Sequence, residues 1–293
     1  MGRRVAHAEG PAVSLLRTEG LSKEFGGVCA VDSLSFAISP GRVYSIIGPN
    51  GAGKTTLLNL LTGIYAPSGG RIFLEDADLT GRAPHEFAQA GVARTFQNLQ
   101  VFFNMTALEN VMVGRYRRER CSLATALLRT PALARAERAC REEAAELMRF
   151  VGLAEWLDAR AEAMPYGALK RLEIARALAT QPRMLLLDEP AAGLNSAEMR
   201  GIGELIGLLA SRGHTVVLVE HNMRLVMGVS DHVLVLDYGR KLAEGTAEEV
   251  RRDPRVIEAY LGSALASDCS VGSATTSGGS AGGTAGSVAP TLH

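Results

Sequence analysis

The sequence contains the segment Gly48-Pro49-Asn50-Gly51-Ala52-Gly53-Lys54-Thr55-Thr56, which fits the pattern G-x-x-x-x-G-K-[ST]. A predicted strand, Arg42–Ile47, precedes it, and a predicted helix, Thr55–Thr62, follows it. The glycines let successive backbone N–H groups surround phosphate oxygens, and the helix start adds the positive end of its dipole. We expect Lys54 to reach the β- and γ-phosphates and the Thr55 hydroxyl to bind Mg²⁺. The alternative is a glycine-rich turn with a surface lysine, which the strand–loop–helix context disfavours.

A second apolar segment, Met184–Leu187, predicts a buried strand, and the acidic pair Asp188-Glu189 follows it directly. A carboxylate at the end of such a strand can hold Mg²⁺ directly or through water, and we assign this role to Asp188. Glu189 can then orient or deprotonate an attacking water molecule. By itself, an acidic pair at a strand end indicates no more than solvated side chains. Together with the phosphate loop, it predicts a site that hydrolyses a nucleoside triphosphate.

Strand and helix patterns alternate through most of the chain, which predicts an α/β fold with a mainly parallel sheet. Further strands are predicted at Thr215–Val219 and His232–Leu236, and helices at Ala134–Val151, Ala168–Ala179 and Ser196–Leu209. Two alternating segments near the start, Ser14–Glu19 and Ser33–Ile38, favour antiparallel strands that flank this core. The stretch from about residue 98 to 163 is expected to be almost wholly helical, and we place an inserted helical subdomain at about 98–180.

The composition restricts the classes of protein to which the chain can belong. Lys plus Arg and Asp plus Glu both number 31, and this balance argues against a nucleic-acid partner. No apolar run has the ~20 residues of a membrane-spanning helix. The four cysteines lack metal-binding spacing and are expected to be reduced thiols. We expect a flexible leader at 1–13, a folded domain at 14–262 and a disordered tail of Gly, Ser, Ala and Thr at 263–293.

These motifs resemble the ATP-binding subunit of an ABC transporter over about residues 14–262. The resemblance implies a P-loop NTPase core with an antiparallel β subdomain, an inserted helical subdomain, and ATP and Mg²⁺ as ligands. Phe25 matches an aromatic residue that stacks on adenine, with a core phenylalanine as the alternative. Gln97 matches the glutamine loop, which senses Mg²⁺ and the γ-phosphate. His221 matches the switch histidine, which contacts the γ-phosphate.

The signature segment departs from the usual family pattern Leu-Ser-Gly-Gly-Gln. The aligned residues are Met164-Pro165-Tyr166-Gly167-Ala168, whereas Leu169–Leu178 matches closely. Pro165 removes a hydroxyl and a backbone N–H, and Ala168 removes an amide side chain. In the family, two subunits face head to tail, so Tyr166 and Gly167 would act on the partner's ATP. Either this composite site is the weaker of the two, or the variant works as well as Ser-Gly-Gly.

Within the superfamily, the chain resembles the ATPase subunits of branched-chain amino acid importers. The residues that carry this similarity are Tyr166-Gly167, Asn104–Val111, Asp188–Asn195, Glu220–Gly228 and the ending Asp253–Gly262. The ATPases of urea or amide importers and of lipopolysaccharide exporters look similar and stay open as alternatives.

The resemblance also implies partners and a location. Two membrane permease subunits would dock on the helical subdomain near Gln97. A second related ATPase, or a second copy of the chain, would complete the pair, and a substrate-binding protein would act indirectly. The chain would then lie at the cytoplasmic face of the membrane. The basic run Arg115–Arg120 is either a solvated helix face or a contact with anionic lipid headgroups.

Three other classes of protein are alternatives to a transporter ATPase. A metabolic P-loop kinase would not need Gln97, Arg171–Leu178 and His221 together. A soluble ABC ATPase that acts on ribosomes or DNA usually has two cassettes or a long coiled coil. A regulatory nucleotide-binding module often lacks the glutamate that is present here as Glu189.

Overall fold

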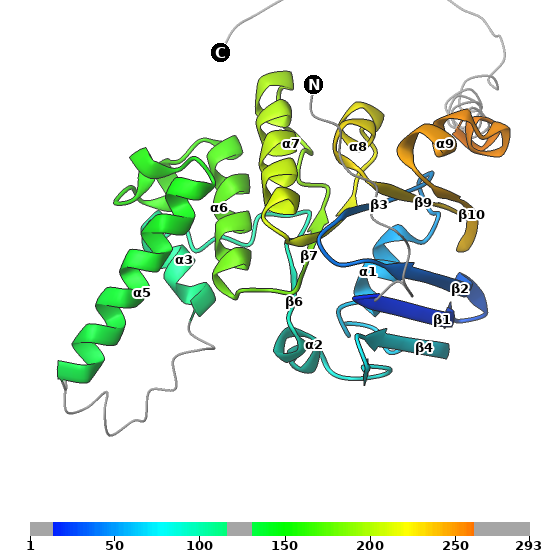
Figure 1. Ribbon diagram of the computed structural model, residues 1–293, viewed down its shortest axis with the longest axis horizontal. Helices are drawn as coiled ribbons and strands as arrows, with labels where there is room; N and C mark the ends of the chain where they lie inside the picture. The colour runs from blue at the N-terminus through cyan, green and yellow to red at the C-terminus, as the bar shows by residue number, and fades with distance from the viewer. Residues whose placement is uncertain (1–13, 116–130, 261–293) are drawn as a thin grey trace, which may run out of the picture.

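The phosphate-loop segment connects strand β3 (Val43–Ile47) to helix α1 (Lys54–Leu60), in the strand–loop–helix order that the motif predicts. The structure is a computed structural model that describes residues 14–115 and 131–260 (Figure 1). The predicted leader and tail, and residues 116–120 of the basic run, lie outside these ranges. Within the two described ranges, no helix is both long and apolar enough to cross a bilayer.

The central sheet has six strands in the order β10-β9-β3-β8-β7-β6. Its other strands are β6 (Val92–Arg94), β7 (Met184–Asp188), β8 (Thr215–Val219), β9 (His232–Asp237) and β10 (Arg240–Gly245). All neighbours are parallel except β9 and β10, which form an antiparallel hairpin. The prediction of an α/β fold with a mainly parallel sheet is confirmed. The sequence pattern missed the edge strands β6 and β10.

A second, antiparallel sheet has the strand order β2-β1-β4-β5. Its strands are β1 (Leu16–Phe25), β2 (Val28–Ile38), β4 (Gly69–Leu74) and β5 (Ala77–Asp78). The predicted antiparallel pair at the start of the chain is confirmed as β1 and β2. Both strands are longer than predicted, because they continue to the turn at Gly26 and Gly27.

Helix α1 is packed between the two sheets, which fixes the helix that begins at the phosphate loop. Its residues Leu57, Leu58 and Leu60 are fully buried and share one core cluster with β1 and with alternate residues of β3 and β8. The opposite face of the central sheet carries α7 (Ser196–Ser211) and α6 (Tyr166–Ala179). Three short helices complete this part: α2 (Pro84–Ala90), α8 (Met223–Val229) and α9 (Ala247–Arg252).

A helical region projects from the β6 edge of the central sheet, at the end of the molecule opposite to β1 and β2 (Figure 1). It contains α3 (Ala107–Arg115), α5 (Pro131–Phe150), α6 and two short 3-10 turns, Ala154–Trp156 and Ala161–Ala163. The expectation that residues 98–163 are almost wholly helical is wrong for 98–106, which form turns and irregular structure. This irregular segment lies between the sheet edge and α6.

Candidate functional site

The phosphate loop is shaped by two glycines that no other residue could replace without strain. Gly48 has a φ of 154° and Gly53 a φ of 95°, both in the region that favours glycine. A Cβ at Gly48 would lie 2.2 Å from the carbonyl oxygen of Leu236, and one at Gly53 would lie 2.4 Å from that of Ala30. Gly53 is also the N-cap of α1, so the loop leads directly into the helix.

Lys54 places its ammonium group within this loop. Its Nζ donates to the carbonyl oxygens of Gly48 at 2.7 Å and of Pro49 at 2.9 Å. Burial lowers the pKa of Lys54, and the negative charges of Glu189 and Asp188 act in the opposite direction. The acidic pair and the lysine therefore share one site. The other predicted loop residues lie in the same turn or in the first turn of α1: Asn50, Gly51, Ala52, Thr55 and Thr56.

The acidic pair lies beside the loop because β7 and β3 are both neighbours of β8 in the parallel sheet, so their carboxyl ends meet at one edge. Asp188 is the last residue of β7 and accepts a hydrogen bond at Oδ2 from Arg94 Nη2 at 2.7 Å. The two side chains are only 9% and 6% exposed, so this is a buried ion pair. Arg94 also donates to Asn59 Oδ1 of α1 at 2.7 Å.

Glu189 lies between the two other predicted hydrolytic residues. Its Oε2 accepts a hydrogen bond from Gln97 Nε2 at 2.9 Å, and its Oε1 is 3.9 Å from His221 Nδ1. Gln97 comes from the segment after β6, and His221 from the segment after β8. Glu189 has a φ of 48°, an unusual conformation for a residue other than glycine. The structure thus brings Gln97, Glu189 and His221 together beside Lys54.

The residues predicted to hold Mg²⁺ offer oxygen donors, which this cation prefers. Thr55 lies in the first turn of α1, and Asp188 and Gln97 lie at the sheet edge beside it. The bond from Arg94 uses Oδ2 of Asp188, so Oδ1 remains for a cation. This donor set fits an Mg²⁺ ion that completes its shell with water and phosphate oxygens.

Phe25 ends β1 and is 42% exposed, so it is not a core phenylalanine. The ring of Tyr65 packs against it edge-on, with 5.2 Å between the ring centroids. The Lys23 ammonium lies 5.0 Å from the centroid of the Phe25 ring. Tyr65 and Lys23 thus hold the Phe25 ring in place, and its exposed part still offers surface for a flat ligand.

The signature residues form the start of α6. Pro165 is the N-cap, Tyr166 is the first helical residue, and Gly167 is buried. The position of a Cβ at Gly167 lies 2.6 Å from Oε1 of Glu198, in the first turn of α7. A Cβ at Gly193 would lie 3.3 Å from the Tyr166 ring, so that ring packs over the loop after Glu189.

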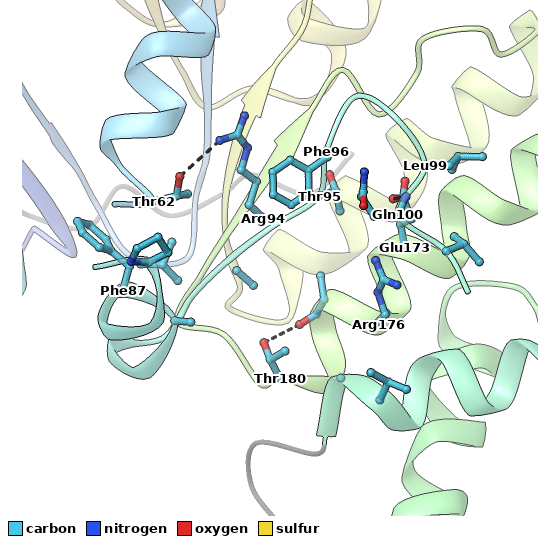
Figure 2. Close-up of a pocket in the computed structure, with 18 of the residues that line it drawn as sticks. Thr62, Phe87, Arg94, Thr95, Phe96, Leu99, Gln100, Glu173, Arg176 and Thr180 are labelled. Carbon is cyan, nitrogen blue, oxygen red and sulfur yellow. Dashed lines mark hydrogen bonds between the residues drawn. The ribbon is translucent and has the colours of Figure 1, made fainter. Parts of the chain in front are cut away.

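A groove of about 1030 Å³ lies between α2, α6 and the segment that follows β6; Figure 2 shows its lining. We call it the α6 groove. Its exposed apolar side chains are Ile64, Phe96, Phe102 and Val113. Its charged residues are Arg94, Glu173 and Arg176. Burial raises the pKa of Glu173 and lowers that of Arg176. The groove therefore offers an apolar surface with a few charged groups.

Two buried side chains of helix α6 also hold the backbone of residues 97–100. Lys170 Nζ donates to the backbone oxygen of Gln97 at 2.9 Å, and Glu173 Oε1 accepts from the Gln100 amide at 2.7 Å. Both side chains belong to residues that are only 3% exposed. Sequence reasoning singled out neither residue, nor Arg94. The sequence signal for these three residues is a charged side chain within an otherwise apolar helix or strand pattern, which indicates that the charge has a buried partner.

Comparison with known proteins agrees with this geometry. Residues 31–192, more than half of the chain, match the ABC transporter family. Residues 240–266 match the branched-chain amino acid ATP-binding cassette transporter family. The chain is 46% identical over 251 residues to the Pseudomonas aeruginosa protein named high-affinity branched-chain amino acid transport ATP-binding protein BraF, covering 85% of this chain and 98% of that protein. Its identity to the Escherichia coli LivG protein of the same description is 45%, with the same coverage.

Solved structures show the same fold. A nucleotide-free ATP-binding cassette from an ABC transporter has a TM-score of 0.73 and 35% identity, over 84% of this chain and 98% of that one. An ATP-binding cassette of an ABC transporter in its ADP conformation has a TM-score of 0.73 and 34% identity, over 85% and 99%. Because the family model and these relatives agree with the phosphate loop and the acidic strand end, the chain belongs to the ABC transporter family, as one of its ATP-binding subunits.

Proposed function

We propose that the chain hydrolyses ATP to power the import of branched-chain amino acids. The observation that carries the hydrolytic part is the meeting of Gln97, Glu189 and His221 beside Lys54 and Asp188. These residues come from separate parts of the sequence and supply a cation, a general base and polar groups at one sheet edge. Such a set matches what phosphoryl transfer to water requires.

Each group has a distinct task in this proposal. The glycine-shaped loop and Lys54 bind the phosphates of ATP, and Thr55, Asp188 and Gln97 would hold Mg²⁺. When bound, Mg²⁺ would offset negative charge on the phosphate oxygens. Glu189 accepts the proton of the attacking water at a carboxylate oxygen.

The contact from Gln97 Nε2 fixes Oε2 of Glu189, which leaves Oε1 facing the His221 side of the site. His221 is 64% exposed at its side chain, so it is available to contact a γ-phosphate. Phe25 offers its partly exposed ring to the adenine.

A second ATPase subunit, related or identical, would complete the site. The start of α6 presents its N-terminal amides at Tyr166 and Gly167, which favour an anion on a facing molecule. The loop after Glu189 lies against the Tyr166 ring, so both segments belong to one surface. This surface is where a partner's ATP would be contacted.

Permease subunits would dock in the α6 groove. Four exposed apolar side chains gather there, which is unusual for a surface that faces only water. Phe96 and residues 99–102, on either side of Gln97 in the sequence, line the groove, so a docked permease would lie next to the hydrolytic site. Docking of this kind would hold the chain at the cytoplasmic face of the membrane, with the substrate-binding protein on the other side.

The assignment of substrate is supported by the relatives, whose names specify branched-chain amino acid transport. It is tested by uptake of leucine, isoleucine and valine in cells whose only copy of the chain is wild type, Glu189→Gln or Glu204→Gln. Glu204 is an exposed residue of α7 and serves as the matched control. We expect uptake to be lost only in Glu189→Gln. Unchanged uptake in Glu189→Gln would refute the substrate assignment, and other amino acids, urea and short amides would be assayed next.

A further inference from the structure

Glu220 is a buried acidic residue that the proposed mechanism does not use. It lies between the end of β8 and His221, and only 1% of its surface is exposed. A carboxylate in such a place is stabilised only if its oxygens accept hydrogen bonds. The partners of this carboxylate therefore indicate what the residue does.

The structure gives Glu220 three hydrogen bonds, each from a backbone N–H. Oε1 accepts from Ala191 at 2.9 Å. Oε2 accepts from His221 at 3.2 Å and from Asn222 at 3.4 Å. One oxygen thus holds the loop after Glu189, and the other holds the segment that carries His221. The carboxylate bridges two loops that are distant in sequence.

The loop after β7 needs such support. Glu189 has a φ of 48°, which costs free energy that the surroundings must offset. On one side, the Glu189 amide donates to the Val219 oxygen at 2.9 Å and is held by the end of β8. On the other side, Ala191 is 4% exposed, and its amide donates to Glu220. Both anchors of Glu189 therefore come from neighbouring residues, Val219 and Glu220.

We infer that Glu220 is a positioning residue for ATP hydrolysis, because its buried carboxylate fixes the Glu189 loop relative to His221. This inference rests on the proposed roles of Glu189 and His221. Among the described residues, the hydrogen bonds of the Glu220 carboxylate go to the loops of Glu189 and His221 and not to the phosphate loop, so we expect Glu220 to act on the hydrolytic step and to leave ATP binding to the phosphate loop and Lys54. Loss of this bridge should lower kcat far more than it weakens ATP binding.

The test uses Glu220→Gln in the full-length chain assembled with its transporter partners. Glutamine has the same size, but its NH₂ group would face either the Ala191 amide or the amides of His221 and Asn222. We expect kcat for ATP hydrolysis to fall by about 10- to 100-fold, because misplaced catalytic groups cost rates of this order. We expect the affinity for ATP, measured by fluorescence titration with an ATP analogue, to change by less than about twofold.

Glu244→Gln is the matched control. Glu244 is also a multiply bonded carboxylate, which accepts from Tyr44 at 2.6 Å and from Lys241 at 2.7 Å, but it lies on β10, outside the hydrolytic loops. This variant should lower the melting temperature and leave kcat unchanged. In a double-mutant cycle, the effect of Glu220→Gln on kcat should become smaller in a His221→Ala background, because one residue acts through the other.

Three results would overturn the inference: an unchanged kcat in Glu220→Gln, an equal loss of kcat and ATP affinity, or strict additivity with His221→Ala. Should Glu220→Gln fold poorly, Glu220→Asp provides the same readout, since its shorter side chain keeps the charge but cannot reach both loops. Hydrolysis at the wild-type rate in Glu189→Gln would instead refute the proposed catalytic role of Glu189.

Discussion

The phosphate loop and the signature turn both depend on glycine, but for different reasons. At Gly48 and Gly53, an added Cβ would meet backbone carbonyl oxygens, and both residues have a positive φ. At Gly167, the three atoms nearest to an added Cβ all belong to the side chain of Glu198, which also caps α7 by accepting a hydrogen bond from the Asn195 amide at 3.0 Å. Gly167 also sits in an ordinary helical turn.

This difference explains how one chain can combine an unaltered phosphate loop with a divergent signature. The first region is enclosed by strands whose backbone cannot move without disturbing the sheet. The second is a helix N-terminus, which keeps the amides of Tyr166 and Gly167 for an anion although Pro165 has no N–H. Side-chain identity is thus more tightly constrained in the phosphate loop than at the start of α6.

The largest expected effect concerns the buried ion pair at the hydrolytic edge. Replacing Arg94 by methionine leaves Asp188 without its charged partner, and we expect the free energy of unfolding to fall by about 3–5 kcal/mol. Denaturant unfolding of the purified chain measures this. The control is Arg82→Met, which removes an exposed pair with Glu86 and should leave the free energy of unfolding almost unchanged. Equal losses in the two variants would mean that the buried Arg94–Asp188 pair stabilises the fold no more than the exposed Arg82–Glu86 pair does.

A second pair of variants tests the comparison of glycines directly. Gly53→Ala introduces both backbone strain and a clash with the Ala30 carbonyl, and should lower the free energy of unfolding by about 2–4 kcal/mol. Gly167→Ala should cost less than about 1 kcal/mol, because the preference of alanine over glycine in a helix, about 1 kcal/mol, offsets the loss of the hydrogen bond that Glu198 accepts from the Asn195 amide. Thermal unfolding of both variants provides the measurement. A larger loss in Gly167→Ala would reverse the conclusion.

The smallest expected effect lies in the signature side chains. The double substitution Pro165→Ser and Ala168→Gln restores a hydroxyl and an amide at the start of α6. One added hydrogen bond contributes about 0.5–1.5 kcal/mol, so we expect the ATPase rate of the assembled pair to rise about two- to tenfold. Steady-state hydrolysis assays are sufficient to detect this. An unchanged rate would mean that the natural Pro-Tyr-Gly sequence already serves fully.

Much of the fold was predictable because its signals are local. The phosphate loop and the apolar segments of β3, β7, β8 and β9 give clear patterns over short stretches. The edge strand β10 was missed because four of its six residues are polar or glycine and it is paired only with β9. Strand β6 has only three residues, too few for a period to be recognised.

The supporting contacts of the site could not be predicted in the same way. The sequence motifs indicate Asp188, Glu189 and His221 themselves. They do not indicate that Arg94 pairs with Asp188, or that the Glu220 carboxylate reaches the Ala191 amide. Such partners are chosen by the order of strands in the sheet, and strand order is a property of the whole chain.

Helix α6 connects the signature turn to the segment that carries Gln97. Tyr166, Lys170 and Glu173 follow each other at helical spacing along one face. The first packs over the loop after Glu189, and the other two hold the backbone at Gln97 and Gln100. The same helix is therefore attached to the loop after Glu189 and to the Gln97 segment. In the proposed assembly, a tilt of α6 imposed by a permease in the α6 groove would therefore also displace Tyr166 and Gly167, which would face the partner's nucleotide.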